Sequence, residues 1–258
     1  MKGDVTIDDF LSGAIKVAQP KSGYRAGIDP ILLAASIPAK SGQTVLELGC
    51  GVGTASLALA HRVTDLNITG VEVQERYAEL ARQNADLNNL PLSVVCADLA
   101  ALPSEFRDQQ FDHVFANPPY FDRSSSTRSG DHGRDRAMGE SDELGIWLSV
   151  AAKRVKPKGY AHFIFRTERM DEFLRLLPES LGSRVTTPIV PRPGCESTLF
   201  MVHARKNGRA AFRLESPLIL HKGECHQQDG EDYSQKISKI LRDGDALTDW
   251  FREQHFFK

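Results

Sequence analysis

The chain has 258 residues, of which 41% are hydrophobic and 26% charged, and its formal net charge is −2 at pH 7. This length suits one large α/β domain, and the nearly balanced charge argues against a protein that coats nucleic acid over its whole surface. No stretch approaches the roughly 20 apolar residues that span a bilayer, so we expect no membrane span and no secretory signal.

The four cysteines lie far apart in the sequence and contain no C-x-x-C pair. Such spacing favours reduced thiols over a disulfide framework or a zinc site. We therefore expect a cytoplasmic protein without a bound metal. The cysteines are Cys50, Cys96, Cys195 and Cys225.

Predicted strands and helices alternate along most of the chain. Residues 4–19 are compatible with a short strand or a helix, and a turn then leads into an apolar stretch at helical spacing from Ile28 to Ala35. Beyond residue 44, apolar and β-branched runs predict strands, and the segments between them have helical periodicity. The predicted strands are 44–51, 68–73, 92–99, 111–117, 160–165, 184–190 and 197–206, and the predicted helices are 54–63, 74–90, 142–155, 169–181 and 232–251.

This alternation predicts an α/β fold built from parallel βαβ units. We expect a mostly parallel seven-stranded sheet with helices on both faces. The last two strands have no long helix between them, so an antiparallel strand is expected at the C-terminal end of the sheet. Ligands of such open sheets bind at the carboxyl ends of the strands.

Three parts of the chain are expected to be distinct. Residues 1–43 should form an N-terminal segment that packs on the core, residues 44–215 the core itself, and residues 216–258 a C-terminal helical extension. The stretch 122–140 is rich in Ser, Gly and Arg and nearly free of apolar residues, which predicts a mobile surface loop.

A glycine-rich turn follows the first core strand, with the sequence Glu47-Leu48-Gly49-Cys50-Gly51-Val52-Gly53. Glycines permit a sharp turn and let a ligand approach the backbone closely. Alone, such a turn could bind a dinucleotide or be only a tight turn. The dinucleotide spacing G-x-G-x-x-G would place glycine where this chain has Thr54. The spacing suits instead a ligand with an amino-acid part and a ribose, whose ammonium Glu47 can reach directly or through water.

Two further acids end the next two predicted strands. Glu72 lies about 20 residues after the glycine loop, where a carboxylate can accept both ribose hydroxyls. Asp98 ends the third strand and can accept from an adenine amino group. Any one of these acids would more often be a strand-end cap or a solvated charge. Three acids at successive strand ends, beside this loop, favour a common ligand.

The fourth strand ends in Asn117-Pro118-Pro119-Tyr120. The prolines lack N–H donors, so carbonyl oxygens can face a substrate unopposed, and Asn117 offers both a carbonyl and an amide group. Accepting the two N–H protons of an exocyclic amine frees the nitrogen lone pair from conjugation. Tyr120 offers a flat face for stacking, worth roughly 1–3 kcal/mol for a base. The other interpretation is a rigid turn without chemistry.

The glycine loop, the three acids and the Asn-Pro-Pro-Tyr turn together resemble the class I S-adenosylmethionine-dependent methyltransferases, which have a Rossmann-like fold. The turn is similar to that of enzymes that methylate adenine, guanine or glutamine amide nitrogens. S-adenosylmethionine is therefore the expected cofactor. The expected cofactor-binding residues are Glu47, Gly49, Cys50, Gly51, Gly53, Glu72, Val73, Asp98, Leu99 and Asn117. The expected catalytic residues are Asn117, Pro118, Pro119 and Tyr120.

Two other stretches narrow the resemblance. The segment from Gln19 to Leu33 and the turn Pro191-Arg192-Pro193-Gly194 resemble those of the bacterial tRNA (adenine-N6)-methyltransferases. That resemblance implies tRNA as partner and the exocyclic amine of adenine as target, in a base that has left its stack. The long 122–140 loop departs from that pattern. The expected substrate-binding residues are Tyr24, Arg25, Tyr120, Arg123, Arg166 and Arg192.

The charge distribution and the turn leave alternatives open. Residues 151–215 hold 13 Lys and Arg against 6 Asp and Glu, which is either a solvated face or a patch for phosphates. A glutamine amide of a protein such as a release factor, or another RNA base amine, is an alternative target. A protein that keeps the fold for binding without turnover is a third interpretation. The sequence leaves open whether the protein is a monomer or a homodimer.

Overall fold

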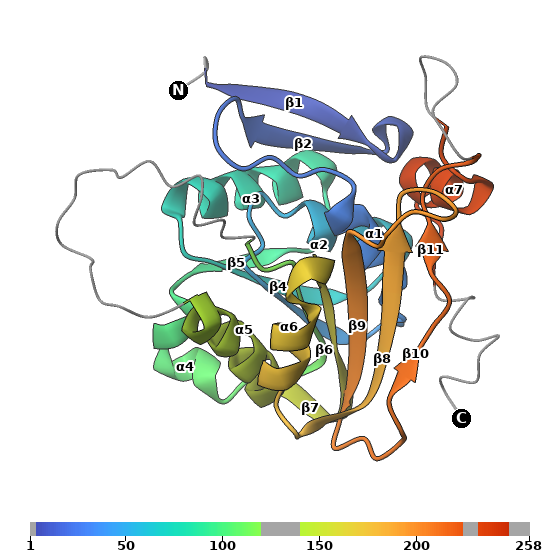
Figure 1. Ribbon diagram of the computed structural model, residues 1–258. Coiled ribbons are helices and arrows are strands. Elements are labelled where there is room, and N and C mark those ends of the chain that lie inside the picture. The colour runs from blue at the N-terminus through green and yellow to red at the C-terminus, as the bar shows by residue number, and fades with distance from the viewer. Residues whose placement is uncertain (1–3, 120–139, 224–231, 248–258) are drawn as a thin grey trace, which may run out of the picture.

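The computed structural model describes residues 4–119, 140–223 and 232–247 (Figure 1). A mixed sheet forms its centre, with the strand order β10-β8-β9-β7-β6-β3-β4-β5 and β11 paired to β8. Its strands are β3 (Thr44–Leu48), β4 (Asn67–Glu72), β5 (Ser93–Cys96), β6 (Phe111–Ala116), β7 (Val155–Arg166), β8 (Leu181–Val190), β9 (Leu199–Lys206), β10 (Arg213–Leu214) and β11 (Leu218–Ile219). The helices are α1 (Asp29–Ser36), α2 (Thr54–Arg62), α3 (Glu75–Asn88), α4 (Ser104–Arg107), α5 (Glu140–Arg154), α6 (Met170–Leu176) and α7 (Gln235–Asp243).

The seven longer strands confirm the predicted mostly parallel sheet. Strands β3 to β7 pair in parallel, whereas β9 is antiparallel to both β7 and β8 and is therefore the predicted antiparallel strand. The short strands β10 and β11, which the sequence did not predict, extend the sheet beside β8. Residues 156–159, which lie between the predicted helix 142–155 and the predicted strand 160–165, are part of β7. The pairing of β7 with β6 is irregular between Phe111 and His113.

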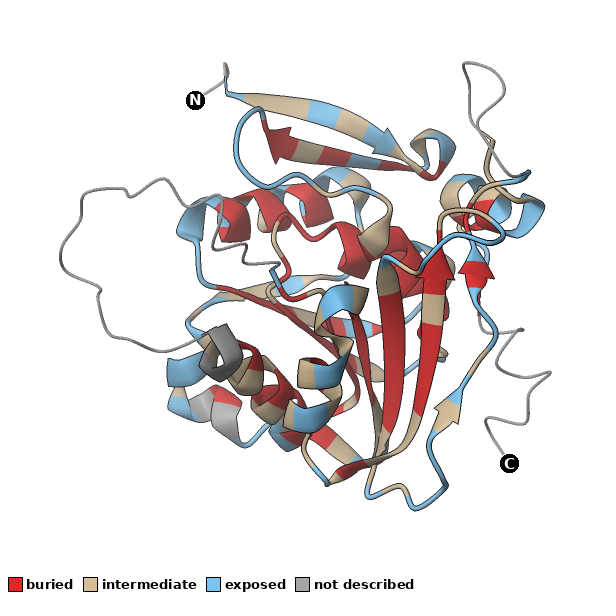
Figure 2. Cartoon of the chain, viewed as in Figure 1, coloured by how far each residue is buried: buried red, intermediate tan, exposed pale blue. Residues whose placement is uncertain are grey.

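Side chains of β3 show how the sheet separates two apolar layers. Val45 packs into the cluster with α1, α2 and α3, whereas Leu46 and Leu48 pack into the cluster with α5 and α6. All three are fully buried. Figure 2 shows buried residues along much of the long strands β8 and β9 as well. Burying one such leucine stabilises the fold by about 1.5–3 kcal/mol. Helices on both faces of the sheet confirm the prediction and leave the strand ends as the accessible edge.

The N-terminal segment is an antiparallel hairpin of β1 (Val5–Phe10) and β2 (Ile15–Pro20). It lies over α3 (Figure 1). The buried side chain of Asn84 joins them, because its Oδ1 accepts from Ala18 N–H at 2.8 Å and its Nδ2 donates to Ala18 O at 3.1 Å. The same Nδ2 donates to Val52 O in the glycine loop at 3.0 Å. The hairpin is thus fixed to the core beside that loop.

The C-terminal segment contributes α7, which covers α1. The amide of Leu247 donates to Ala35 O at 2.8 Å, and Ile237 and Ile240 are fully buried. The predicted helix 232–251 is shorter in the structure, since Gly244 ends it with a φ of 72°. Within the described ranges, no helix combines the length and the apolar character needed to cross a membrane.

A row of three buried histidines crosses β6, β7 and β9. His113 Nδ1 lies 3.0 Å from His162 Nε2, and His162 Nδ1 lies 2.7 Å from His203 Nδ1. At the other end, His113 Nε2 lies 3.1 Å from Gln43 Oε1, which also accepts from Lys40 N–H at 2.7 Å. Burial lowers the pKa of all three imidazoles, to about 4 for His113 and about 3 for His203.

Candidate functional site

The glycine loop turns from β3 into α2 through three left-handed backbone conformations. Gly49, Gly51 and Gly53 have φ values of 63°, 54° and 85°, a backbone region that residues other than glycine rarely adopt. The amide of Cys50 donates to Val71 O at 2.9 Å, and that of Gly53 donates to Cys50 O at 2.8 Å. The loop is therefore a fixed turn whose geometry explains the glycine spacing.

Glu72 is held rigidly beside this loop. Its Oε2 accepts from Gly51 N–H and its Oε1 from Gln74 N–H, both at 2.9 Å. Each carboxylate oxygen can accept more than one hydrogen bond, so both can still accept from a ligand hydroxyl. Two fixed oxygens at a strand end fit the two hydroxyls of a ribose.

Glu47 is 4% exposed and points toward the start of α2. Its Oε2 accepts from both the amide and the hydroxyl of Ser56. Burial, and to a smaller extent the nearby charge of Glu72, raise the pKa of Glu47 to about 8 against the lowering effect of the Ser56 bonds. A cation beside this carboxyl would favour its ionised form.

Three further residues of the expected cofactor site differ in what they present. Val73 is 61% exposed, so its apolar side chain is open to a flat ring. Asp98 is exposed and caps the turn Leu99–Ala101, because its Oδ1 accepts from Ala100 N–H at 2.8 Å. Cys50 packs inward, since a Cβ on Gly70 would lie 2.7 Å from its Sγ. It therefore presents only its backbone to the strand-end edge.

Asn117 and Pro118 follow β6 next to the glycine loop. The register pairs Leu48 with Ala116, which places Gly49 and Asn117 side by side at the strand ends. Pro118 is buried, Asn117 half-buried and Pro119 exposed. The predicted site residues Tyr120 and Arg123, and nearly all of the predicted 122–140 loop, lie outside the described residues.

Tyr24 approaches the same loop from the N-terminal segment. Its Cε1 lies 3.8 Å from the position that a Cβ on Gly51 would take. Although 55% of the residue is exposed, partial burial of the phenol and the charges of Asp29 and Glu47 raise its pKa to about 12. Tyr24, predicted to contact substrate, therefore lies against the part of the loop that faces Glu72.

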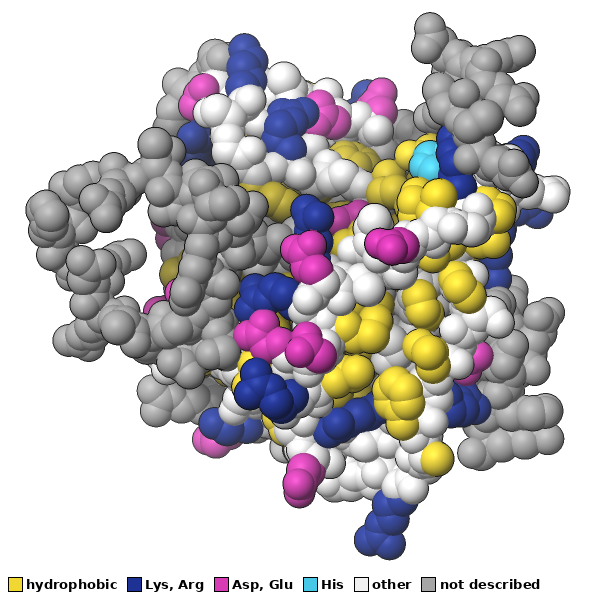
Figure 3. Space-filling model, viewed as in Figure 1, with side chains coloured by type: hydrophobic (Ala, Val, Ile, Leu, Met, Phe, Trp, Pro, Cys, Tyr) yellow, Lys and Arg dark blue, Asp and Glu magenta, His cyan; other side chains and the backbone are white. Residues whose placement is uncertain are grey.

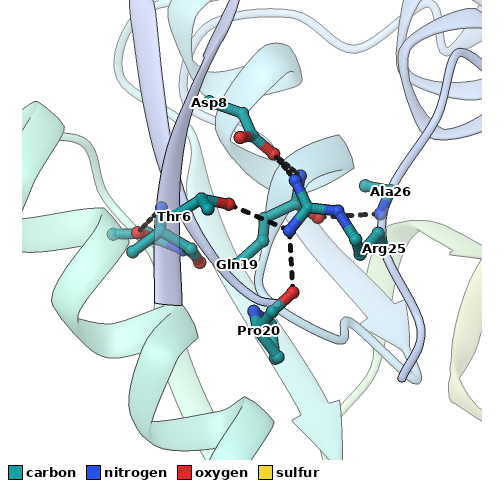
Figure 4. Close-up of polar contacts among 8 residues, drawn as sticks. Thr6, Asp8, Gln19, Pro20, Arg25 and Ala26 are labelled. Atoms are coloured by element: carbon teal, nitrogen blue, oxygen red, sulfur yellow. Dashed lines mark hydrogen bonds and ion pairs between the residues drawn. The ribbon is translucent and has the colours of Figure 1, made fainter. Parts of the chain in front are cut away.

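Arg25 is engaged within the N-terminal segment (Figure 4). Its Nη1 donates to Thr6 Oγ1 at 2.9 Å and to Pro20 O at 2.7 Å, and its Nη2 pairs with Asp8. These bonds fasten the hairpin to the segment that carries Tyr24. Its predicted contact with substrate stays a prediction.

The other two expected substrate arginines lie at the same edge on the far side of Asn117. Arg166 ends β7 and is exposed. Arg192 follows β8, and its guanidinium pairs with Asp232 and donates to Lys222 O. Arg192 thus ties the β8–β9 turn to the C-terminal segment, and its role in substrate binding is likewise untested.

The surplus of positive charge in residues 151–215 does not gather into one surface in the view of Figure 3. Lys or Arg and Asp or Glu side chains alternate over the face that carries α6. Arg169, for example, pairs with Glu172 at 2.8 Å and lies over the Phe165 ring. This face resembles a solvated mixed-charge surface.

Trp147 of α5 is a site residue that sequence reasoning missed. A Cβ on Gly49 would lie 2.2 Å from its Cη2, so the indole occupies the space in which a side chain at position 49 would stand. The residue is half-buried. Tryptophan is rare in this chain, which has only two, and that rarity could have drawn attention to Trp147. Its contact with Gly49 could not be predicted, because Gly49 lies 98 positions away in the sequence.

The arrangement fits S-adenosylmethionine in the chemistry of its groups. Glu72 offers two fixed acceptors for a ribose, Glu47 a buried carboxyl for an ammonium, and Val73 an apolar surface for adenine. The described residues contain no group of three or more His, Cys, Asp or Glu placed to hold a metal ion.

Comparisons with known proteins agree with this fold. Residues 45–127 match the family described as "Methyltransferase domain". The tRNA1(Val) (adenine(37)-N6)-methyltransferase of Shewanella halifaxensis is 31% identical over 163 residues, which are 62% of this chain and 65% of that protein. The enzyme of the same name from Cronobacter sakazakii is 29% identical over 83% of this chain and 82% of its own.

Solved structures share the architecture. A predicted O-methyltransferase from Agrobacterium tumefaciens superposes with a TM-score of 0.68 at 24% identity, over 84% of this chain and 97% of its own. A 16S rRNA N2 G1207 methyltransferase from T. thermophilus, solved with AdoMet and guanosine, has a TM-score of 0.54 at 19% identity, over 78% of this chain and 50% of its own. At these identities the likeness concerns the fold.

The fold is that of the class I S-adenosylmethionine-dependent methyltransferases, and residues 45–127 match a methyltransferase domain. Within that class, the chain resembles the bacterial tRNA1(Val) (adenine(37)-N6)-methyltransferases.

Proposed function

We propose that this protein methylates the exocyclic amine of an adenine in tRNA, in the cytoplasm. The position of Asn117 next to Gly49 carries the proposal, because it sets an amide and a proline carbonyl beside the loop suited to the cofactor. The relatives named as tRNA1(Val) adenine-N6 enzymes support tRNA as the substrate class.

Bound S-adenosylmethionine supplies a methyl group on a positively charged sulfur, which is a strong methyl donor. The protein's own residues have to orient an amine toward it. The side-chain carbonyl of Asn117 and the backbone carbonyl of Pro118 each accept a hydrogen bond from one N–H of the amine, which frees the nitrogen lone pair. After methylation, the nitrogen loses its extra proton to solvent. Holding the two reactants in line supplies most of the acceleration, so no strong general base is required.

The cofactor half of the site has separate duties. Glu72 accepts hydrogen bonds from the ribose hydroxyls, and Glu47 pairs with the ammonium group. Val73 and Asp98 border the adenine. The bonds from Gly51 and Gln74 hold both carboxylate oxygens of Glu72 in place, so little ordering is needed on binding. The target adenine must be unstacked, since an amine inside a helix cannot reach the sulfonium.

Incubation with methyl-labelled cofactor tests this function. Purified protein is mixed separately with total tRNA, rRNA and ribosome-associated protein, and the Asn117→Ala variant serves as the inactive control. We expect label in tRNA that ribonuclease removes, recovered as N6-methyladenosine after digestion. Label that protease removes instead would identify a glutamine-type protein target, and label in rRNA or on another base would identify a different RNA target; either would refute the proposal.

A further inference from the structure

The contact between Trp147 and Gly49 lies where the two halves of the site meet. Within the indole, Cη2 and Cζ3 lie 2.2 and 2.7 Å from the position of a Cβ on Gly49. Any side chain at position 49 would displace the ring. The first glycine of the loop is therefore needed for this aromatic neighbour as well as for its φ of 63°.

The strand register fixes what else lies near this ring. Leu48 pairs with Ala116, so Gly49 and Asn117 are the next residues of neighbouring strands. An aromatic side chain in contact with Gly49 is consequently at the junction of the glycine loop and the Asn-Pro turn.

Helix α5 holds Trp147 at this junction from one side. Leu144 and Leu148, the neighbours of Trp147 on the helix, are buried in the apolar layer of α5 and α6. Trp147 itself packs only partly against that layer and stays half-buried. The helix is therefore firmly anchored, and part of the Trp147 residue remains exposed.

The cofactor residues lie toward the opposite side. Glu72 bonds to Gly51 and Gln74, and the Tyr24 ring borders Gly51. These groups belong to β4 and the N-terminal segment, whereas the indole reaches the loop from α5. The indole thus meets the loop at Gly49, the residue beside Asn117, whereas the Tyr24 ring meets it at Gly51, the residue bonded to Glu72.

We propose that the Trp147 indole forms the α5-side wall of the acceptor pocket and that the target nucleobase stacks on it. This inference rests on the proposed function. A flat wall would hold the plane of the base so that its amine meets Asn117, which is orientation that hydrogen bonds alone do not provide. Every base has a π-face, so stacking supplies affinity while Asn117 selects the amine.

The competing explanation is that the indole only fills the space beside a glycine. Two variants separate the explanations: Trp147→Leu keeps an apolar side chain but removes the flat face, and Trp147→Phe keeps a smaller flat face. Phe212→Leu is the matched control, because Phe212 is 51% exposed beside β10, at the far edge of the sheet.

Methylation of tRNA is measured for each variant, together with the Kd of S-adenosylhomocysteine and the melting temperature. For Trp147→Leu we expect the KM for tRNA to rise about fivefold or more, the equivalent of about 1 kcal/mol of lost stacking. Trp147→Phe should show a smaller rise in the KM for tRNA. The Kd of the cofactor product should stay within about twofold, and Phe212→Leu should match the wild type in every readout.

Indole fluorescence gives a direct measurement. In a Trp250→Phe background, Trp147 is the single tryptophan of the chain. The protein is saturated with S-adenosylhomocysteine and titrated with a seven-nucleotide RNA containing one central adenine, or uracil in its place. We expect saturable quenching with the adenine oligomer and weaker or no quenching with the uracil oligomer.

The possible results distinguish the two proposals. If tRNA is methylated but Trp147→Leu leaves its KM unchanged and adenine RNA does not quench the indole, the wall is wrong and the proposed function stands. If Trp147→Leu lowers melting temperature and cofactor affinity together with activity, and quenching is absent, the ring is only structural. If the wild type methylates no RNA, the proposed function fails and the base-stacking wall fails with it.

Discussion

Glu47 gives a prediction that connects the chemistry of the site to the stability of the fold. Burial raises its pKa from 4.5 to about 8, so the folded protein holds a proton there that the unfolded chain has already released. A carboxyl whose pKa is raised in the folded state stabilises the fold fully below pH 4.5. This stabilisation is lost as the pH rises to about 8. We therefore expect Glu47→Gln, which cannot ionise, to lack this loss.

The magnitude follows from the shift. At about 1.36 kcal/mol per pKa unit, the shift lowers the free energy of unfolding of the wild type, relative to its value at low pH, by under 1 kcal/mol at pH 5 and by about 4 kcal/mol at pH 7.5. Glutamine keeps an oxygen to accept from Ser56, but its buried NH₂ group adds a cost that does not depend on pH. The informative quantity is therefore the difference between the two pH values, about 3 kcal/mol in favour of the variant at pH 7.5.

Urea denaturation without cofactor measures this difference. Wild type and Glu47→Gln are unfolded at pH 5 and pH 7.5, and Glu196→Gln, an exposed position, is the control. The same substitution should weaken S-adenosylmethionine binding, since it removes the partner proposed for the ammonium. If the stability of Glu47→Gln relative to wild type is the same at both pH values, the buried and protonated state of Glu47 is refuted.

Three other outcomes are expected. Asn117→Ala should abolish methyl transfer while calorimetry finds cofactor affinity within a few-fold of wild type; retained activity would contradict the amine mechanism. Glu72→Ala should weaken cofactor binding by about 1–3 kcal/mol through lost ribose hydrogen bonds, and an unchanged Kd would exclude that role. In the Glu47→Gln background, adding His113→Asn should make the fall in the free energy of unfolding from pH 6.5 to 4.5 about 2 kcal/mol smaller, because His113 has a folded pKa of about 4 and an ordinary value of 6.5. His162 and His203, whose pKa values burial also lowers, add to the fall in both proteins. Stability from such a base is complete above pH 6.5 and is lost as the pH falls, so a His113→Asn variant with an equally steep loss would argue against it.

The order of strands and helices was predictable because each core element carries its own periodic signal. The apolar run before Gly49 and the amphipathic helix containing Asn84 are examples. By contrast, β10 and β11 have two residues each, too short for any periodicity. Residues 4–19 were ambiguous for a related reason, since two six-residue strands resemble short helical segments until their pairing is known.

The site was predictable where it depends on local geometry and unpredictable where it depends on distant partners. The glycine spacing follows from backbone conformation, which a sequence encodes directly. For Arg25 and Arg192, the residue type indicates a positive charge but does not identify Asp8 and Asp232, the acids that pair with them. Only the packing of α5 against β3 could reveal the contact of Trp147 with Gly49.

The hydrogen bonds along the row of His113, His162 and His203 all run in one direction. Lys40 N–H can only donate, so the atom it meets on Gln43 is the carbonyl oxygen, and His113 Nε2 must carry a proton toward that oxygen. His113 Nδ1 is then an acceptor, which requires His162 to donate from Nε2 and His203 to donate from Nδ1. One backbone amide before β3 thereby dictates the tautomer of three side chains on three different strands. Adding a proton to His113 Nδ1 would set two donors against each other, and the row would have to reverse or separate as a unit.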